Sequence, residues 1–272
     1  MKGPLRLLLF SLRRVRVLVL VMGLLLAVFQ VFLIVIARSI QRSNAFAQMG
    51  ALIPPFAREL MGPSLPSFMS FGGIVCLGYF HLSVMGSLVG ISIGLATTPA
   101  AEIESGFVDL ILCRPIGRHW LITRSIVVAL LCTTALLLMM LAGTWAGLNS
   151  LAPADVEWPT RKLILSLAGN LGLLMLGWSG IAMAIGSASR RRSVAGALAG
   201  LAALATFLLD YIARVWQPAE SVAWLSPFRY YSPFDLLMGN PLPARNLEVL
   251  AGIAAAGFIL AYIFFSRRDI SH

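Results

Sequence analysis

Six long apolar runs constrain the fold of this chain more than any other feature of its sequence. A helix needs about 17–25 residues to cross the roughly 30 Å hydrocarbon core of a bilayer, and each run reaches that length. The predicted spans are 17–37, 71–96, 126–148, 163–188, 194–211 and 247–265. The sequence therefore predicts an all-α integral membrane protein with six transmembrane helices, folded as a single transmembrane domain over residues 1–272.

The composition also indicates a surface that faces lipid. Hydrophobic residues make up 59% of the 272 positions and charged residues only 12%, whereas soluble domains are about 25% charged. A disordered chain is excluded too, because it would need low hydrophobicity. The three cysteines, Cys76, Cys113 and Cys132, form no CxxC pair. They therefore predict neither a metal site nor a redox motif.

The positive charge of the chain is distributed unevenly across the predicted topology. The net charge is +10, which by itself is compatible with a nucleic-acid binder. With the N-terminus in the cytoplasm, 13 of the 21 Lys and Arg residues lie on the inner side and 8 on the outer side. Membrane proteins concentrate Lys and Arg on the cytoplasmic side. We therefore expect N-in, C-in topology and no nucleic-acid partner.

Two segments outside the spans are predicted to form helices of their own. Residues 1–16 mix apolar and cationic side chains at helical spacing. This pattern indicates an interfacial helix in the headgroup plane, and the alternative is a basic flank of the first span. Residues 212–246 contain Trp, Tyr and Pro punctuation, which favours short helices in an outer loop at the membrane surface.

Within the spans, small and polar residues stand out. Glycines recur at helical spacing, a pattern that lets helices approach closely in lipid. These glycines are Gly86, Gly90, Gly94, Gly143, Gly147, Gly196 and Gly200. Gln30, His81 and Asn170 are isolated polar residues deep in spans. Each is a candidate for a substrate pathway, and the alternative is a hydrogen bond between two helices.

The cytoplasmic segment 97–125 is the most informative part of the chain. Acidic residues open it at Glu102 and Glu104, Gly106 and Pro115 punctuate it, and arginines close it. This order predicts short amphipathic helices, whose surface could dock a partner protein. The alternative is a solvated charged face without a partner.

On these residues the sequence resembles the permease subunits of type-two ATP-binding-cassette (ABC) transporters, which export substrates or flip lipid-linked ones. In that family this loop carries an acidic residue, Gly, a Leu-rich turn, Pro-x-x-Arg and a basic residue opening the next span. The matching residues are Glu102 or Glu104, Gly106, Leu110, Pro115, Arg118 and Arg124. Weaker matches lie at 52–62, 225–231 and 265–269. The chain departs from the family at Phe107, where Thr is common, and at Arg124, where Lys is usual.

The resemblance implies a machine built from several chains in a bacterial or archaeal plasma (inner) membrane. Two six-helix permeases, identical or different, would pair around a central pathway, and each would dock a separate ATPase through the 97–125 segment. In this arrangement Glu102 and Glu104 would face basic groups on the ATPase. Arg118 would hold the loop or pair across the interface. The implied activity is export.

The sequence itself places ATP hydrolysis on another chain. A P-loop needs a Gly-rich turn followed by Lys and then Ser or Thr. The only two lysines are Lys2, followed by Gly, and Lys162, followed by Leu. We therefore expect no enzyme activity, no catalytic residues, no metal ligands and no cofactor in this chain, with ATP and Mg on the partner ATPase.

Two functions other than transport are also to be considered for this sequence. Residues 177–180 fit the GxSG pattern of rhomboid intramembrane proteases, with Ser179 as the nucleophile. Such a serine needs a histidine base, and the last predicted span contains none. A membrane anchor or scaffold that transports nothing is the main alternative.

The topology can be tested with reporter fusions. A fluorescent protein that matures only in the cytoplasm should be bright when fused to the C-terminus and dark when inserted between the third and fourth predicted spans. Alkaline phosphatase, which is active only outside the cytoplasm, should give the reverse pattern at the same two sites. Phosphatase activity at the C-terminus would contradict N-in, C-in topology.

Overall fold

Six long helices form the body of the protein. The computed structural model describes residues 2–43, 70–108, 117, 119–153 and 156–267, and this part of the chain contains no strand. The membrane-length elements are α1 (Lys2–Arg42), α5 (Phe71–Phe80) continued by α6 (Leu82–Ala96), α9 (His119–Leu151), α10 (Arg161–Ala188), α11 (Arg192–Ala213) and α14 (Ala244–Arg267). All six spans are long and apolar enough to cross a membrane. For the described residues, the prediction of an all-α protein with six such helices is confirmed.

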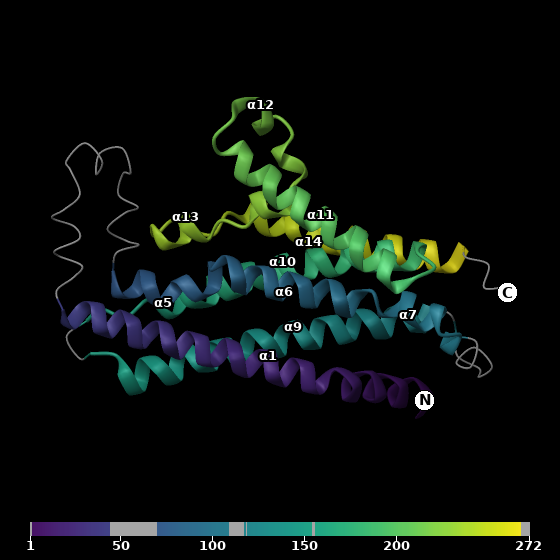
Figure 1. Ribbon diagram of the computed structural model, residues 1–272, viewed down its shortest axis with the longest axis horizontal. Helices are drawn as coiled ribbons and strands as arrows, with labels where there is room; N and C mark the ends of the chain where they lie inside the picture. Colours follow the sequence, from purple (N-terminus) through teal and green to yellow (C-terminus); the bar gives the residue numbers. More distant parts are fainter. Residues whose placement is uncertain (1, 44–69, 109–116, 118, 154–155, 268–272) are drawn as a thin grey trace.

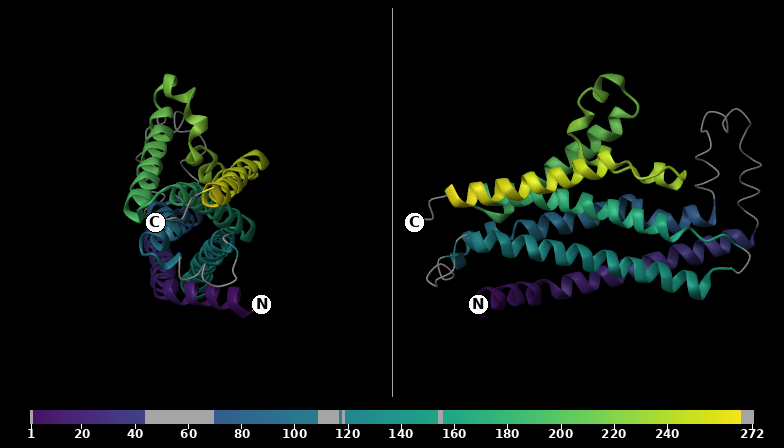
Figure 2. Two further views of the ribbon diagram at one scale, coloured as in Figure 1. Left: turned by 90° about the vertical axis from the view of Figure 1, so that its right-hand side faces the viewer. Right: turned by 180° about the vertical axis from the view of Figure 1, so that it is seen from behind.

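The helices run side by side along the long axis of the molecule (Figure 1). The start of α1, the end of α14 and the short helix α7 (Thr98–Glu104) lie at the same end of the bundle, which we call the terminal end. In both figures α11 leans away from the other helices and carries α12 (Gln217–Glu220) at its far end (Figures 1 and 2). The first and last membrane-length helices therefore bring residues 2 and 267 to the same end of the molecule as the start of the 97–125 segment.

The first helix is longer than the predicted span. α1 runs without a break for 41 residues, so residues 2–16 continue directly into 17–37. No interruption separates an interfacial helix from the span. Pro4 lies in the first turn, where its missing N–H costs no hydrogen bond. The placement of residues 2–16 at the membrane surface stays a prediction.

The second span, which the sequence predicts as one continuous helix over 71–96, is broken at His81. His81 ends α5 and begins α6 with an extended backbone conformation, φ −60° and ψ 130°. Its Nδ1 accepts a hydrogen bond from the backbone N–H of Ser83 at 3.3 Å. A side-chain acceptor satisfies an N–H that a helix start leaves free. His81 is therefore a helix cap inside the second span.

Two pairs of helices pack in close contact through glycine. A Cβ atom added to Gly143 on α9 would lie 2.5 Å from Ala27 Cα on α1. On α10, a Cβ added to Gly180 would lie 2.6 Å from the carbonyl oxygen of Ala254 on α14. A Cβ added to Gly257 would come equally close to the carbonyl oxygen of Gly180. The backbones of α1 and α9, and those of α10 and α14, are thus in direct contact. Such close packing is expected in lipid, where the hydrophobic effect does not drive helices together.

The other predicted glycine stripes do not pack within this chain. Nothing lies within 4 Å of a Cβ added to any of the five glycines on α6 and α11. These are Gly86, Gly90, Gly94, Gly196 and Gly200. The pattern correctly indicated close packing for Gly143 and Gly147 on α9. For α6 and α11 it marks open surface.

The segment between α11 and α14 contains short helices anchored on the spans. They are α12, η1 (Ala223–Leu225), η2 (Pro227–Tyr230) and α13 (Pro233–Leu237). The hydroxyl of Tyr231 donates to the carbonyl oxygen of Tyr79 at 2.7 Å, and the hydroxyl of Ser226 donates to that of Thr206 at 2.8 Å. Burial raises the pKa of Tyr231, which keeps its hydroxyl a donor. This segment is therefore tied to α5 and α11.

We expect the glycine contact between α10 and α14 to be essential for stability. Gly257→Ala should lower the free energy of unfolding by about 1–3 kcal/mol, because the added methyl group meets backbone. Gly252→Ala is the matched control on the same helix, since a Cβ there meets nothing within 4 Å. That change should be neutral or stabilising by up to about 1 kcal/mol. Unfolding in mixed detergent micelles measures both, and equal effects would contradict the packing account.

Candidate functional site

The short helix α7 is the centre of the site at the terminal end. It follows α6 directly, because Thr97 is both the C-cap of α6 and the N-cap of α7. Pro99 lies in its first turn, where proline favours a helix start. Gly106 follows its end with φ +69°, a conformation that favours glycine. The predicted punctuation by Gly106 thus has a backbone cause.

A buried ion pair joins α7 to α9. Arg124 Nη2 donates to Glu102 Oε2, and the side chains are only 2% and 5% exposed. The other two ion pairs among the described residues, Asp210–Arg214 and Glu220–Arg229, each have a largely exposed partner. The Glu102 carboxylate therefore points into the bundle. The resemblance implied instead that Glu102 faces outward, toward basic groups of a partner.

The second acidic residue of α7 holds the start of α11. Glu104 Oε2 accepts a hydrogen bond from the backbone N–H of Arg192 at 2.9 Å. The N-cap residue of α11, Arg191, makes no side-chain cap hydrogen bond, so Glu104 supplies the missing acceptor. A carboxylate is favourable at a helix N-terminus because the helix dipole is positive there. Arg192 Nη2 also donates to the carbonyl oxygen of Gly94 on α6 at 3.2 Å.

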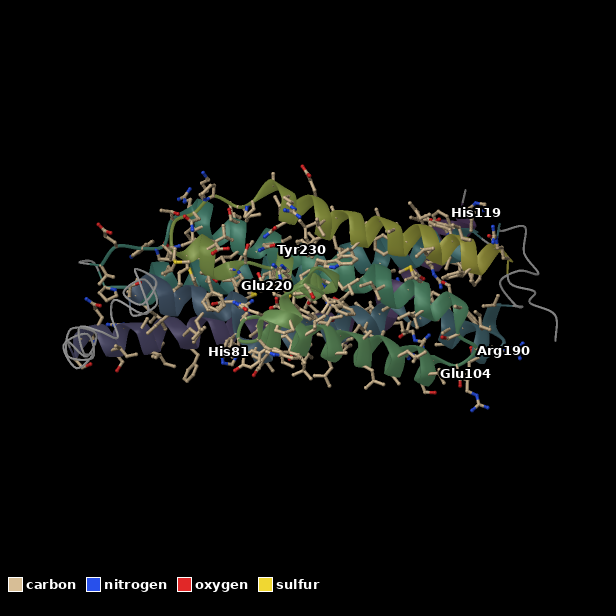
Figure 3. The ribbon with its side chains drawn as sticks, turned by 90° about the horizontal axis from the view of Figure 1, so that it is seen from above. His81, Glu104, His119, Arg190, Glu220 and Tyr230 are labelled. Atoms are coloured by element: carbon tan, nitrogen blue, oxygen red, sulfur yellow. The ribbon has the colours of Figure 1, made fainter. Side chains whose placement is uncertain are left out.

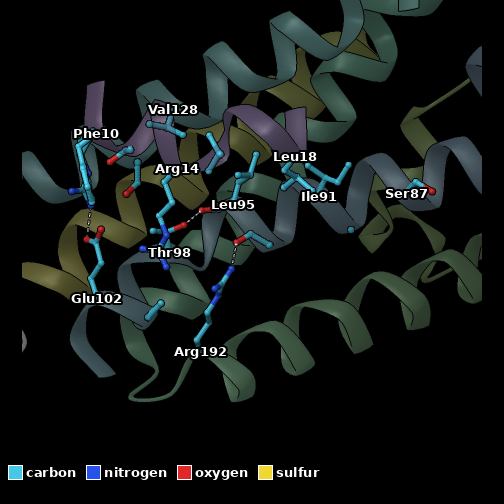
Figure 4. A pocket seen from close by; sticks show the side chains of 17 residues that line it. Phe10, Arg14, Leu18, Ser87, Ile91, Leu95, Thr98, Glu102, Val128 and Arg192 are labelled. Carbon is cyan, nitrogen blue, oxygen red and sulfur yellow. Dashed lines mark hydrogen bonds and ion pairs between the residues drawn. The ribbon is translucent and has the colours of Figure 1, made fainter. Parts of the chain in front are cut away.

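A pocket of about 410 Å³ adjoins this network, between α1, α6, α7, α9 and the start of α11. Its charged lining residues are Arg14, Glu102, Arg124 and Arg192, and apolar residues such as Leu18 and Ile91 continue the wall. Figure 4 shows Arg14 and Arg192 reaching into the pocket from different helices. Figure 3 shows that Glu104, Arg190 and His119 also lie at the terminal end, far from His81.

The predicted docking residues are only partly visible. Glu102, Glu104 and Gly106 lie together on α7 and just after it. Leu110, Pro115 and Arg118 lie outside the described residues, and so does the 52–62 match. Arg124, which completes the family pattern, is the partner of Glu102.

The predicted pathway residues do not line the pocket, and two of the three are buried. Gln30 and Asn170 are 0% and 1% exposed, and their amide atoms have no hydrogen-bond partner among the described residues. Gln30 packs on Gly78, where an added Cβ would lie 2.5 Å from its Nε2. The ring centroids of His81 and Phe29 are 5.6 Å apart. Gln30 and His81 thus share the α1–α5 contact, whereas Asn170 lies on α10.

Sequence reasoning missed the roles of Arg14 and Arg192. Both belong to arginine clusters, at residues 13–16 and 190–192, that served only as topology signals. Their convergence with Glu102 depends on how distant helices pack. The nearest local signal was the helical spacing of Arg14 and Leu18, which places them on one face of α1.

The structure offers little to the protease alternative. Ser179 is 1% exposed, and its hydroxyl oxygen has no hydrogen-bond partner in the described part of the chain. The described residues also contain no cluster of His, Cys, Asp and Glu that could hold a metal ion. No known protein family matches the chain, and no curated protein matches it either.

We expect the buried pair to be the most sensitive point of the terminal end. Glu102→Gln leaves the Arg124 guanidinium buried without a counter-charge, so the free energy of unfolding should fall by about 3–5 kcal/mol. Glu220→Gln removes one half of an exposed pair and should cost about 0.5 kcal/mol or less. Adding Arg124→Gln to the first variant should restore part of the loss. Equal effects of Glu102→Gln and Glu220→Gln would contradict the role of the pair.

Proposed function

We propose that this chain is the permease subunit of an ABC exporter, driven by a separate ATPase. The observation that carries the proposal is the attachment of α7 to three spans at once. α7 continues α6, contacts α9 through Glu102 and Arg124, and contacts α11 through Glu104 and Arg192. A solvated loop needs no attachment to several spans. A segment that transmits the motion of a partner to the spans needs such an attachment.

The docking surface in this proposal is the outer side of α7 and the segment that follows it. Glu104 is exposed and would meet a basic group of the ATPase. Arg118, in the same segment, would hold the loop or pair across the interface. Glu102 acts as a positioning residue instead, because its carboxylate is taken by Arg124. The resemblance in motif order around Gly106 and Pro115 supports this choice of surface.

The transmitted motion would be a shift between two rigid helix pairs. The α1–α9 pair and the α10–α14 pair are each sealed by glycine contacts, so each would move as a unit. Close-packed bundles move between discrete arrangements rather than deform continuously. A push on α7 reaches α9 through Arg124 and would displace the first pair against the second. Gln30 on α1 and Asn170 on α10 lie on opposite sides of that division.

The proposal includes a second permease chain beside α11. Only 22% of the most apolar window of α11 is buried, and Gly196 and Gly200 face open space. Leu201 and Leu204 on the same helix are more than half exposed. Small residues next to exposed leucine support a close helix contact with another chain in lipid. The second chain would be an identical or a different permease.

A pathway between the two permeases that carries few charges suits an apolar or amphipathic cargo.

Co-expression with a candidate ABC ATPase tests the function. Glu104→Lys combined with Arg118→Glu should abolish co-purification of the ATPase, because both charges on the docking surface are reversed. Glu220→Lys is the control and should leave co-purification unchanged, because Glu220 lies near the middle of the molecule, away from Glu104 (Figure 3).

The wild-type chain should also stimulate ATP hydrolysis by that ATPase. A membrane anchor or scaffold should bind without stimulation. Unchanged co-purification and hydrolysis with the double variant would contradict docking through α7. Stimulation by the wild type that is lost in the double variant is the result we expect.

A further inference from the structure

The pocket at the terminal end carries positive charge that the protein does not neutralise. Three arginines and one glutamate line it, and Glu102 is already paired with Arg124. Arg14 and Arg192 take part in none of the ion pairs among the described residues. Glu104 binds the backbone of Arg192 and does not line the pocket. Arg192 Nη2 donates to the carbonyl oxygen of Gly94 at 3.2 Å, which leaves the positive charge of Arg192 without a counter-charge. The charges of Arg14 and Arg192 therefore remain available to an anion.

The rest of the pocket is an apolar groove that leads away from these charges. Ser87, Gly90, Gly94 and Thr98 follow one another along α6 and the start of α7 at spacings of three or four residues, so they share one face. From Thr98 to Ser87 this face is about 16 Å long, at 1.5 Å per residue. Nothing lies within 4 Å of a Cβ added to Gly90 or Gly94. The two glycines thus leave a shallow channel.

The apolar side chains beside this channel come from α1 and α6. Leu18 and Ile91 line it further into the bundle than Arg14 and Thr98 (Figure 4). The pocket is therefore amphipathic along its length, with its cations at the terminal end and its apolar wall toward the middle of the spans. A phospholipid has the same division between headgroup and acyl chain.

We propose that this pocket binds one anionic phospholipid from the leaflet at the terminal end. Arg14 and Arg192 would hold the phosphate, since guanidinium groups match phosphate geometry with paired hydrogen bonds. One acyl chain lies over Gly90 and Gly94, against Leu18. A volume of about 410 Å³ accepts the headgroup and the first part of that chain. The lipid bridges α1 and α11 next to the Glu102–Arg124 pair.

This assignment requires only that the chain spans a membrane, so it stands apart from the proposed ABC function. A free phosphate ion would satisfy the two arginines equally well. It would leave the glycine channel unfilled. The channel is therefore what separates a lipid from a soluble anion.

Native mass spectrometry of the purified full chain in a neutral detergent tests the proposal. Phosphatidylglycerol, phosphatidylcholine and inorganic phosphate are titrated separately. We expect one phosphatidylglycerol per chain, bound at least tenfold more tightly than phosphatidylcholine. Arg14→Gln combined with Arg192→Gln should remove this preference. Arg16→Gln combined with Arg190→Gln removes the same charge at exposed positions outside the pocket and should keep it.

A second variant tests the channel without changing charge. Gly90→Leu should weaken phosphatidylglycerol binding at least tenfold, while the thermal unfolding midpoint in lipid-free detergent stays near that of the wild type, because a Cβ at this position meets nothing within 4 Å. Equal loss in both double variants would mean that only net charge matters, and would overturn the proposal. Phosphatidylglycerol binding that is unaffected by Gly90→Leu, at a site where inorganic phosphate competes with it, would show a site for a soluble anion and would also overturn the proposal.

Discussion

The arrangement of the terminal end depends on one buried ion pair, Glu102 with Arg124. A charge at the end of an apolar bundle is costly unless it is paired, so neither residue can leave the other without a large loss of stability. The pair fixes α7 against α9. With α7 fixed, Glu104 reaches the first turn of α11, and Arg192 in turn reaches α6. Glu102 and Arg124 also form part of the wall of the pocket.

The sequence predicts the six helices because their cause is local: each apolar run is long enough to be a span on its own. It does not predict how they meet. Glu102 and Arg124 are 22 positions apart, and Gly180 and Gly257 are further still. Both residues of each pair are visible in the sequence, but only the packing brings them together. The break at His81 was hidden for a different reason, since a single capping residue hardly changes the hydropathy of an otherwise apolar run.

The candidate site shows the same division. The acidic residues and glycine of α7 were found from their order in the 97–125 segment, whereas the inward direction of Glu102 was not. Glycine stripes predicted close packing everywhere, and this is correct only on α9. On α6 and α11 the glycines are open. We propose that a lipid fills the first opening and a second permease chain the second, so that the unused small residues mark contacts with molecules other than this chain.

The central claim is that a push on α7 is transmitted to α9 through Glu102 and Arg124. It is tested most directly by the distance between spin labels at Asn149 and Arg245, exposed positions at the far ends of α9 and α14, measured by pulsed electron paramagnetic resonance in the complex with the ATPase. The account predicts that ATP changes this distance in the otherwise wild-type chain. It also predicts no change in Glu102→Gln, although the ATPase remains bound through Glu104. A change that persists in Glu102→Gln, or none in the wild type, would contradict it.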